Sequence, residues 1–349
     1  MKKILSSVAV IMLSSSTYAN IIVPEISRDG KSRNSSVIAT SQEKRKFVSV
    51  EYNSSTFEKD NVDSELDRNS IDIYGEWSNS MFTFAADLRD GKGDYHQVAD
   101  YDYDYYNIAI GYRLNERLSL GLAHTVDKEA IDSAVVHTDS QLPETEFGLS
   151  YKLNNLVIGA SIAHHSSDRK TTIKSISLVR ETEGDWYGYR LGVGSNANNM
   201  SWEAGIEYNA EGDSSSDTTK RDSKFGVFAG ITKVINDIEF DADIFYITGD
   251  NLVETNLSSN DYKKLNVNLD AEILIGKMFY VTPGLYYNDR VVGPVEEDSL
   301  GLSADFGYRA NSFDATLGVD YQLSGEYIDG TGAYDTDQMA WKVNVAYNF

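Results

Sequence analysis

One stretch of the chain, His164-His165-Ser166-Ser167, places two imidazoles next to two hydroxyls. A nucleophile–base pair of this kind needs a third group, usually a carboxylate, that orients the base. No acid at a recognisable spacing accompanies the stretch. The chain also has no cysteine to supply a thiol nucleophile, a disulfide or a thiolate metal ligand. We therefore expect no enzymatic activity and no cofactor.

Carboxylates gather in two other segments, and hard cations such as Ca²⁺ and Mg²⁺ prefer oxygen ligands. The run Asp100-Tyr-Asp-Tyr-Asp104 lacks the glycine and the closing glutamate of an EF-hand. We expect solubilising surface charge here and no metal site. The acids are Glu58, Asp60, Asp63, Glu65 and Asp67 in the first segment and Asp90, Asp94, Asp100, Asp102 and Asp104 in the second.

A larger set of charged side chains alternates with apolar ones along the chain. Alternation at every second residue puts the two kinds on opposite faces of a β-strand. The acids on the polar face are Asp72, Glu76, Asp87, Glu146, Glu203, Glu207, Glu239, Asp241, Asp243, Asp270, Glu272, Asp305, Asp314 and Asp320. The bases are Arg89, Arg113, Arg117, Lys152, Arg190, Lys224, Lys264, Arg309 and Lys342. Acids outnumber bases, so a cation is favoured wherever these faces line an aqueous space.

The composition excludes further classes of protein. The chain has 349 residues, 54 Asp+Glu against 31 Lys+Arg, and a formal net charge of −23. A nucleic-acid partner is not expected, because its phosphates require a basic surface. A hydrophobic fraction of 41% with 11% aromatics is too high for a disordered chain.

Residues 1–19 have the pattern of a cleaved secretory signal peptide. Lys2 and Lys3 precede a short apolar run, and Thr17 and Ala19 place small residues before a cut at Asn20. No later segment reaches about 18 uninterrupted apolar residues, the length that a membrane-spanning helix needs. An exported soluble protein and an outer-membrane β-barrel remain.

The elements that must position the alternating side chains are β-strands. In the last segment, Trp341 and Val343 share one face, and Lys342 and Asn344 share the other. Such runs last about nine to eleven residues, as in a tilted membrane-spanning strand, and aromatic residues often bracket them. Strands of soluble sandwiches are shorter, at about five or six residues. We predict an all-β fold, a closed antiparallel transmembrane β-barrel over residues 46–349.

Short turns rich in Asn, Gly and Asp alternate with longer connections, which predicts sixteen strands, with fourteen as the fallback. The short turns are expected on the periplasmic side and the long loops outside the cell. The long loops are predicted at 54–68, 90–104, 127–144, 167–185, 210–222, 250–261, 289–298 and 323–337. The stretch 172–179 partly alternates, which would also suit a strand that extends beyond the membrane. Residues 20–45 lack alternation and are predicted as a periplasmic tail or a segment that enters the lumen.

The ending Trp341-Lys-Val-Asn-Val-Ala-Tyr-Asn-Phe349, with the signal peptide and the hairpin rhythm, resembles Gram-negative outer-membrane porins as a class. Its alternating residues Trp341, Val343, Val345, Tyr347 and Phe349 resemble the signal read by the barrel-assembly machinery. The resemblance implies a place in the cell outer membrane, in contact with its lipid and lipopolysaccharide. The segment 127–144 lacks the Pro-Glu-Phe-Gly-Gly constriction motif of trimeric porins, so monomer and trimer both remain open.

Barrel diameter grows with strand number, and about sixteen strands leave a water-filled channel. We expect passive diffusion of ions and small hydrophilic solutes, with a preference for cations. Tyr74, Trp186, Tyr280 and Tyr286 would face the lumen, where they fill space or stack on sugar rings. The alternative is a plugged or closed barrel that acts in surface interaction or adhesion through its acidic loops.

Overall fold

A computed structural model of the chain describes residues 26–27, 31–32, 46–59, 65–79, 81–95, 99–197, 200–214, 223–236, 238–250, 261–292, 295–310, 312–329 and 332–348. The predicted signal peptide and Phe349 of the predicted assembly signal lie outside these ranges. So does most of the segment 20–45, in which only β1 (Ile26–Ser27) and β2 (Lys31–Ser32) are described, paired with each other. Within the described ranges, no helix is long and apolar enough to cross a membrane.

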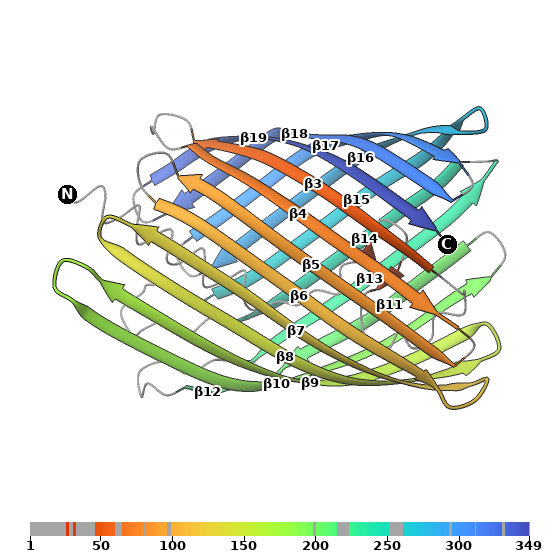
Figure 1. The fold of residues 1–349 in the computed structure, drawn as a ribbon, viewed down its shortest axis with the longest axis horizontal. Helices are drawn as coiled ribbons and strands as arrows, with labels where there is room; N and C mark the ends of the chain where they lie inside the picture. The colour runs from red at the N-terminus through yellow and green to blue at the C-terminus, as the bar shows by residue number, and fades with distance from the viewer. Residues whose placement is uncertain are drawn as a thin grey trace.

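Sixteen long antiparallel strands form a closed barrel (Figure 1). They are β3 (Lys46–Lys59), β4 (Glu65–Ser78), β5 (Phe82–Tyr95), β6 (Ala99–Arg113), β7 (Leu118–Ser133), β8 (Val136–Leu153), β9 (Leu156–Ile173), β10 (Leu178–Ala197), β11 (Met200–Asn209), β13 (Lys224–Ile235), β14 (Ile238–Asp250), β15 (Asp261–Ile275), β16 (Phe279–Val292), β17 (Val295–Ala310), β18 (Phe313–Asp329) and β19 (Gly332–Asn348). Each pairs with the next long strand, and β19 pairs with β3, which closes the ring. A two-residue strand, β12 (Asp213–Ser214), pairs with β10. The predicted all-β barrel of sixteen antiparallel strands is confirmed.

The first and last barrel strands meet at one end of the barrel, where Phe47 is opposite Asn348. We call this end the terminal rim and the opposite end the hairpin rim. Short turns close the terminal rim, as predicted. The Asn115 carboxamide oxygen accepts hydrogen bonds from two following backbone amides at 2.9 Å each. Asn154, Asn236 and Gly276 adopt positive φ angles of 55°, 50° and 78°, which asparagine and glycine tolerate best.

Alternation decides which side chains face outward. On β19 the odd-numbered positions Trp341, Val343 and Tyr347 are 42%, 40% and 51% exposed, whereas Lys342 between them is only 9% exposed. The same large apolar residues that a soluble protein would bury therefore form an outer band around the barrel. The described part of the predicted assembly signal, Trp341 to Tyr347, contributes its apolar row to this band.

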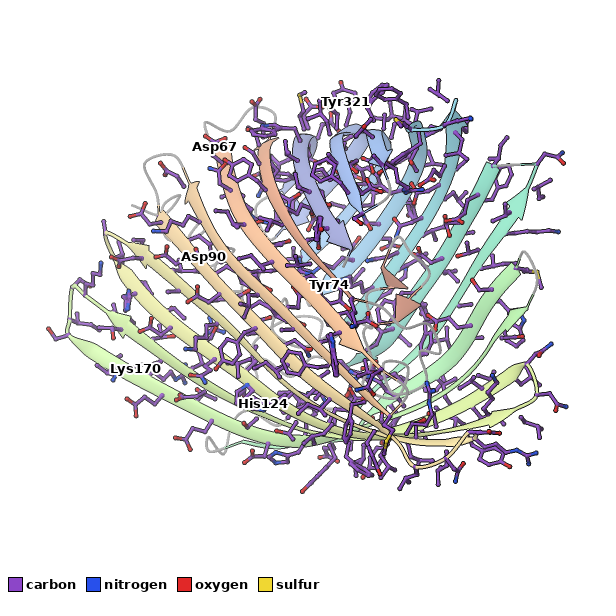
Figure 2. All side chains as sticks on the ribbon, turned by 45° about the vertical axis from the view of Figure 1, so that its right-hand side comes forward. Asp67, Tyr74, Asp90, His124, Lys170 and Tyr321 are labelled. Atoms are coloured by element: carbon purple, nitrogen blue, oxygen red, sulfur yellow. The ribbon has the colours of Figure 1, made fainter. Side chains whose placement is uncertain are left out.

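The wall is uneven in height. Strands β8, β9 and β10 have 18, 18 and 20 residues, while β11 and β13 have 10 and 12. The long strands reach farthest at the hairpin rim, beyond the neighbouring wall (Figure 1), and Lys170 in Figure 2 lies close to their tips. The prediction of long loops at 127–144 and 167–185 is wrong. Both segments consist of paired strands joined by a short turn. The extension foreseen at 172–179 is confirmed on both sides of its turn.

Strand also shortens the connections predicted at 54–68, 90–104, 289–298 and 323–337, whereas those at 210–222 and 250–261 agree with the ends of the long strands. β3 and β4 pair as far as Glu58↔Glu65, β5 and β6 as far as Tyr95↔Ala99, and β18 and β19 as far as Asp329↔Gly332. The physical reason is that alternation continues beyond the apolar band, with polar residues in the outward positions. Hydropathy falls there, although the backbone pairing does not stop.

Candidate functional site

The inner face of the barrel is the candidate site. On each strand it occupies the positions between the exposed apolar residues, so parity and burial together assign a charged side chain to a face. The predicted pore-lining residues at inner-face positions are Asp72, Glu76, Asp87, Arg89, Arg113, Glu146, Lys152, Arg190, Glu203, Glu207, Lys224, Glu239, Asp241, Asp243, Lys264, Asp270, Glu272, Asp305, Arg309, Asp314, Asp320 and Lys342. The prediction that Arg117 lines the pore is wrong. Arg117 lies exposed in the turn between β6 and β7 and hydrogen-bonds to Tyr151 on the outer face.

Arg190 on β10 is the centre of a buried ion network. Its guanidinium lies 3.0 Å from Glu146 and 3.6 Å from Glu144, both on β8, and 3.2 Å from Glu207 on β11. All four side chains are buried. The Asn209 amide donates a further hydrogen bond to Glu207 at 2.8 Å. Because an unpaired buried charge costs several kcal/mol, these groups hold strands together and offer little charge to the lumen.

His165 on β9 extends this network. Its Nδ1 lies 3.0 Å from a Glu144 carboxylate oxygen, and its ring stacks on Trp186 with centroids 5.0 Å apart. The expectation that no acid accompanies the histidine–serine stretch is wrong. The acid is Glu144, which comes from the neighbouring strand β8. The Ser167 hydroxyl donates to the Gly184 carbonyl at 3.5 Å. We call the inner face of β8–β11 around Arg190 and His165 the packed wall.

The inner face of β14 and β15 is arranged differently. Across this ladder Glu239 is directly opposite Glu272, and Asp241 is directly opposite Asp270. Like charges in facing positions repel each other. Neutral donors supply part of the compensation, as the Thr232 hydroxyl does for Asp241 at 2.6 Å. We call this surface, with the neighbouring Asp243, the acidic wall.

The acidic wall ends at a cationic group on the terminal rim. Arg309 on β17 donates two hydrogen bonds to Glu272, at 2.8 and 3.0 Å, and one to Asp314 on β18 at 2.7 Å. The Tyr280 hydroxyl also donates to Asp314 at 2.7 Å. Arg309 is about half exposed, with 49% of its side-chain surface open, so this network lies at a mouth of the barrel and not within a core.

Other inner-face cations also lie close to acids. Arg89 is 3.6 Å from both Asp72 and Asp87, and Lys342 is 3.1 Å from Asp305. These contacts bring together predicted residues from neighbouring strands. The predicted charges therefore form several local pairs around the inner face, and acids face acids in the acidic wall and also at Glu51 and Asp72 on β3 and β4.

An apolar cluster on the inner face was missed from the sequence. Phe228, Phe245, Ile247 and Tyr262 are buried together on β13, β14 and β15. The Lys224 ammonium lies 3.6 Å from the centre of the Tyr262 ring, within cation–π range. The signal for this cluster is the run Ile244-Phe-Tyr-Ile247, where apolar residues occupy both parities and the alternation fails.

The inner aromatic residues make intramolecular contacts. Tyr74 packs against a cluster of inner-face alanines, and its hydroxyl donates to Glu76 at 3.3 Å. A Cβ on Gly301 would lie 2.2 Å from the Tyr286 ring, so only glycine leaves room for that ring. These contacts favour space filling, and stacking on sugar rings stays a prediction.

The acids predicted in loops lie partly on extended strands near the hairpin rim, where Figure 2 labels Asp67 and Asp90. Asp67, Asp94, Asp100 and Asp132 occupy matching positions on four successive strands. A hydrogen bond from Lys174 at 2.5 Å holds the pKa of Asp132 below its usual value. Within the described ranges, no group of three or more His, Asp or Glu side chains is arranged to hold a metal ion.

No protein-family model and no curated protein matches the sequence. Among solved structures, CdiB from Acinetobacter baumannii is similar with a TM-score of 0.55 at 11% identity, over 85% of this chain and 60% of that chain. A TodX monoaromatic hydrocarbon channel, in a deltaS2 mutant, is similar with a TM-score of 0.50 at 11% identity, over 90% of this chain and 93% of that chain. The fold is that of Gram-negative outer-membrane β-barrels. This chain spans less than two thirds of the CdiB chain.

Proposed function

We propose that this protein is an outer-membrane channel that lets ions and small hydrophilic solutes diffuse passively, with a preference for cations. The fold and the outward apolar band support insertion in a lipid bilayer, since a closed sheet leaves no backbone edge unpaired in hydrocarbon. The proposal includes export through residues 1–19, assembly through the C-terminal strand, and contact with lipopolysaccharide.

The facing carboxylates of the acidic wall carry the cation preference. Asp241 and Asp270 are directly opposite, as are Glu239 and Glu272. Carboxylates grouped on a pore wall lower the free energy of cations in the adjacent water and raise that of anions. The packed wall contributes less, because its three glutamates are buried around Arg190, away from the water of the lumen.

Planar bilayers with a KCl gradient test this proposal. We expect stable single-channel steps and a reversal potential of the cation-selective sign. The double variant Asp241→Asn with Asp270→Asn is expected to reduce the K⁺ over Cl⁻ permeability ratio severalfold, because it removes one facing pair without changing side-chain size.

A matched control is the double variant Asp94→Asn with Asp100→Asn. These two aspartates are also opposite each other across a ladder, but at outward positions near the hairpin rim. The control should leave the permeability ratio almost unchanged. An anion-selective reversal potential, or an equal loss in both variants, would overturn the cation preference. Absence of conductance from a barrel that keeps its heat-modifiable gel migration would favour the surface-interaction alternative.

A conduit for hydrophobic compounds is a second candidate function. The buried inner cluster of Phe228, Phe245, Ile247 and Tyr262 favours it, and the TodX barrel of similar fold is named as a monoaromatic hydrocarbon channel. Uptake of radiolabelled toluene into vesicles tests this candidate. Uptake that falls when Phe245 is replaced by serine, with unchanged KCl conductance, would support the hydrophobic conduit.

A further inference from the structure

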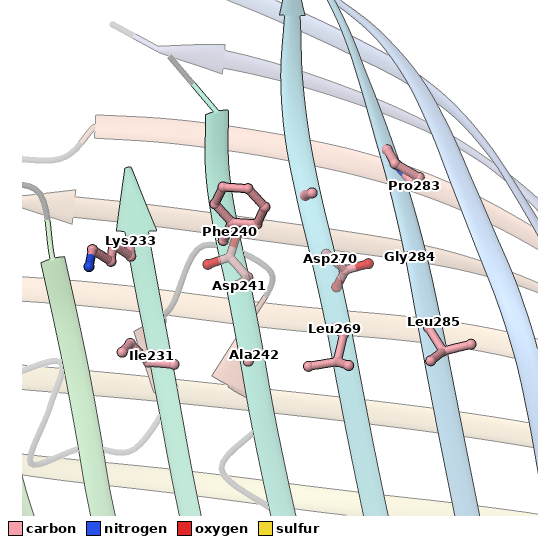
Figure 3. A pocket seen from close by; sticks show the side chains of 11 residues that line it. Ile231, Lys233, Phe240, Asp241, Ala242, Leu269, Asp270, Pro283, Gly284 and Leu285 are labelled. Carbon is pink, nitrogen blue, oxygen red and sulfur yellow. The ribbon is translucent and has the colours of Figure 1, made fainter. Parts of the chain in front are cut away.

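A groove of about 560 Å³ crosses the outer surface of β13–β16 (Figure 3). Its volume lies within the range of about 300–1,000 Å³ that is common for ligand sites. The side chains of Ile231, Leu269 and Leu285 stand on the outer face, as do Phe240 and Pro283. Asp241, Asp270 and Gly284, which occupy inner-face positions, also line the groove, so it borders the acidic wall across the thickness of the sheet.

Two alanines create the space. Ala242 on β14 is opposite Ile231 on one side and Leu269 on the other. One large side chain therefore stands on each side of the Ala242 methyl group. Ala271 on β15 is opposite Phe240 in the same way. The groove thus follows from large and small residues in facing positions, and it does not require an irregular strand.

The ladder beside the groove is interrupted at Pro283 on β16. Pairing between β15 and β16 runs to Asp270↔Gly284 and resumes only at Ile273↔Val281. Proline has no amide hydrogen and cannot donate a ladder hydrogen bond. At the last pair before the interruption, a Cβ on Gly284 would lie 2.0 Å from Asp270 Oδ1 and 2.2 Å from the Ser303 hydroxyl. Asp270 and Ser303 therefore cover the inner side of Gly284, next to the interruption.

We propose that this groove binds one acyl chain of an anionic phospholipid whose phosphate pairs with Lys233. The inference rests on the proposed membrane placement. Ile231, Leu269 and Leu285 supply apolar contacts for the chain, and Lys233 is the basic residue of the groove lining. Lys233 is exposed and lies two residues before β13 ends at the terminal rim, where a lysine reaches the lipid headgroups. The ligand chemistry is hydrocarbon along the alanines with a negative charge at the rim.

Native mass spectrometry of the full barrel, released from detergent with added phosphatidylglycerol or phosphatidylcholine, tests this inference. We expect wild type to retain one phosphatidylglycerol preferentially. Filling the groove with Ala242→Phe and Ala271→Phe should reduce retention at least tenfold. Lys233→Gln should reduce the preference for phosphatidylglycerol about fivefold, as expected for one basic residue at an anionic lipid surface.

Matched controls are Ala315→Phe, at an outward position on β18, and Lys46→Gln, an exposed lysine at the same rim. Both should retain the lipid as wild type does. Equal retention by wild type and the filled variant, or equal loss in the controls, would overturn the inference. A barrel that conducts but retains no lipid overturns the groove alone, whereas one that retains lipid but does not conduct overturns the proposed channel alone.

Discussion

The packed wall and the acidic wall follow the same alternation but use charge in opposite ways. In the packed wall, one arginine lies against three glutamates, and all four side chains are buried. In the acidic wall, Asp241 is opposite Asp270, and both side chains are only partly buried. The difference shows that the number of charges on an inner face does not set its effect on ions. What matters is how deeply each charge is buried away from the water of the lumen.

The first prediction tests whether the buried Arg190 network stabilises the folded barrel. Replacing Arg190 by leucine leaves the buried Glu144, Glu146 and Glu207 without their shared cation. We expect the free energy of unfolding to fall by about 3–5 kcal/mol, the usual cost of stranding a buried charge. Urea unfolding in lipid vesicles, followed by tryptophan fluorescence, measures the change.

Arg309→Leu is the matched control, because Arg309 also hydrogen-bonds to two acids but is 49% exposed. Its loss should stay below about 1 kcal/mol, since solvent screens the charges that remain. Equal losses for the two variants would mean that burial does not distinguish the two walls.

The barrel itself could be predicted from the sequence, because the patterns that indicate its strands and turns involve residues close together in the chain. Period-two alternation, turn asparagines and strand length are all read along the chain, and they predict strand number, direction and most face assignments. The height of the wall could not be predicted so well. Strands such as β8 and β9 continue past the apolar band as polar ribbons, where hydropathy no longer marks them.

The pairing within the site could not be predicted, because it depends on register between strands. Glu144 and His165 are 21 positions apart in sequence, and only the β8–β9 ladder places them side by side. The facing of Asp241 and Asp270 is likewise a property of the ladder. Arg117 failed for a different reason, because the strand begins one residue later than its alternation indicates.

A smaller loss of stability is expected from a substitution at Gly284, next to Asp270 of the acidic wall. A Cβ at Gly284 would meet the Asp270 carboxylate at 2.0 Å and the Ser303 hydroxyl at 2.2 Å. Gly284→Ala must therefore displace Asp270, at a cost of about 1–3 kcal/mol for an overpacked site. Gly192→Ala on β10 is the control, because the nearest atom to its Cβ, on Phe228, lies at 3.6 Å. Thermal unfolding measures both, and a similar shift in the two variants would contradict the close approach at Gly284.

The smallest effect is expected at the tips of the tall wall, away from both charge networks. Lys174 joins two hairpins, since its ammonium donates to Asp132 at 2.5 Å and to the Ser133 carbonyl at 2.7 Å. Lys174→Met should raise the pKa of Asp132 towards its ordinary value of about 3.9, as measured by carboxyl NMR titration. A pKa that is lowered in the folded state stabilises the fold above the ordinary value and ceases to do so as the pH falls through the lowered one. The difference in stability between wild type and Lys174→Met should therefore shrink in acid.

Lys170→Met, which removes an exposed contact to Glu181 at 3.1 Å, should leave the Asp132 pKa unchanged. An unchanged Asp132 pKa in Lys174→Met would show that the hairpin tips are not joined in this way.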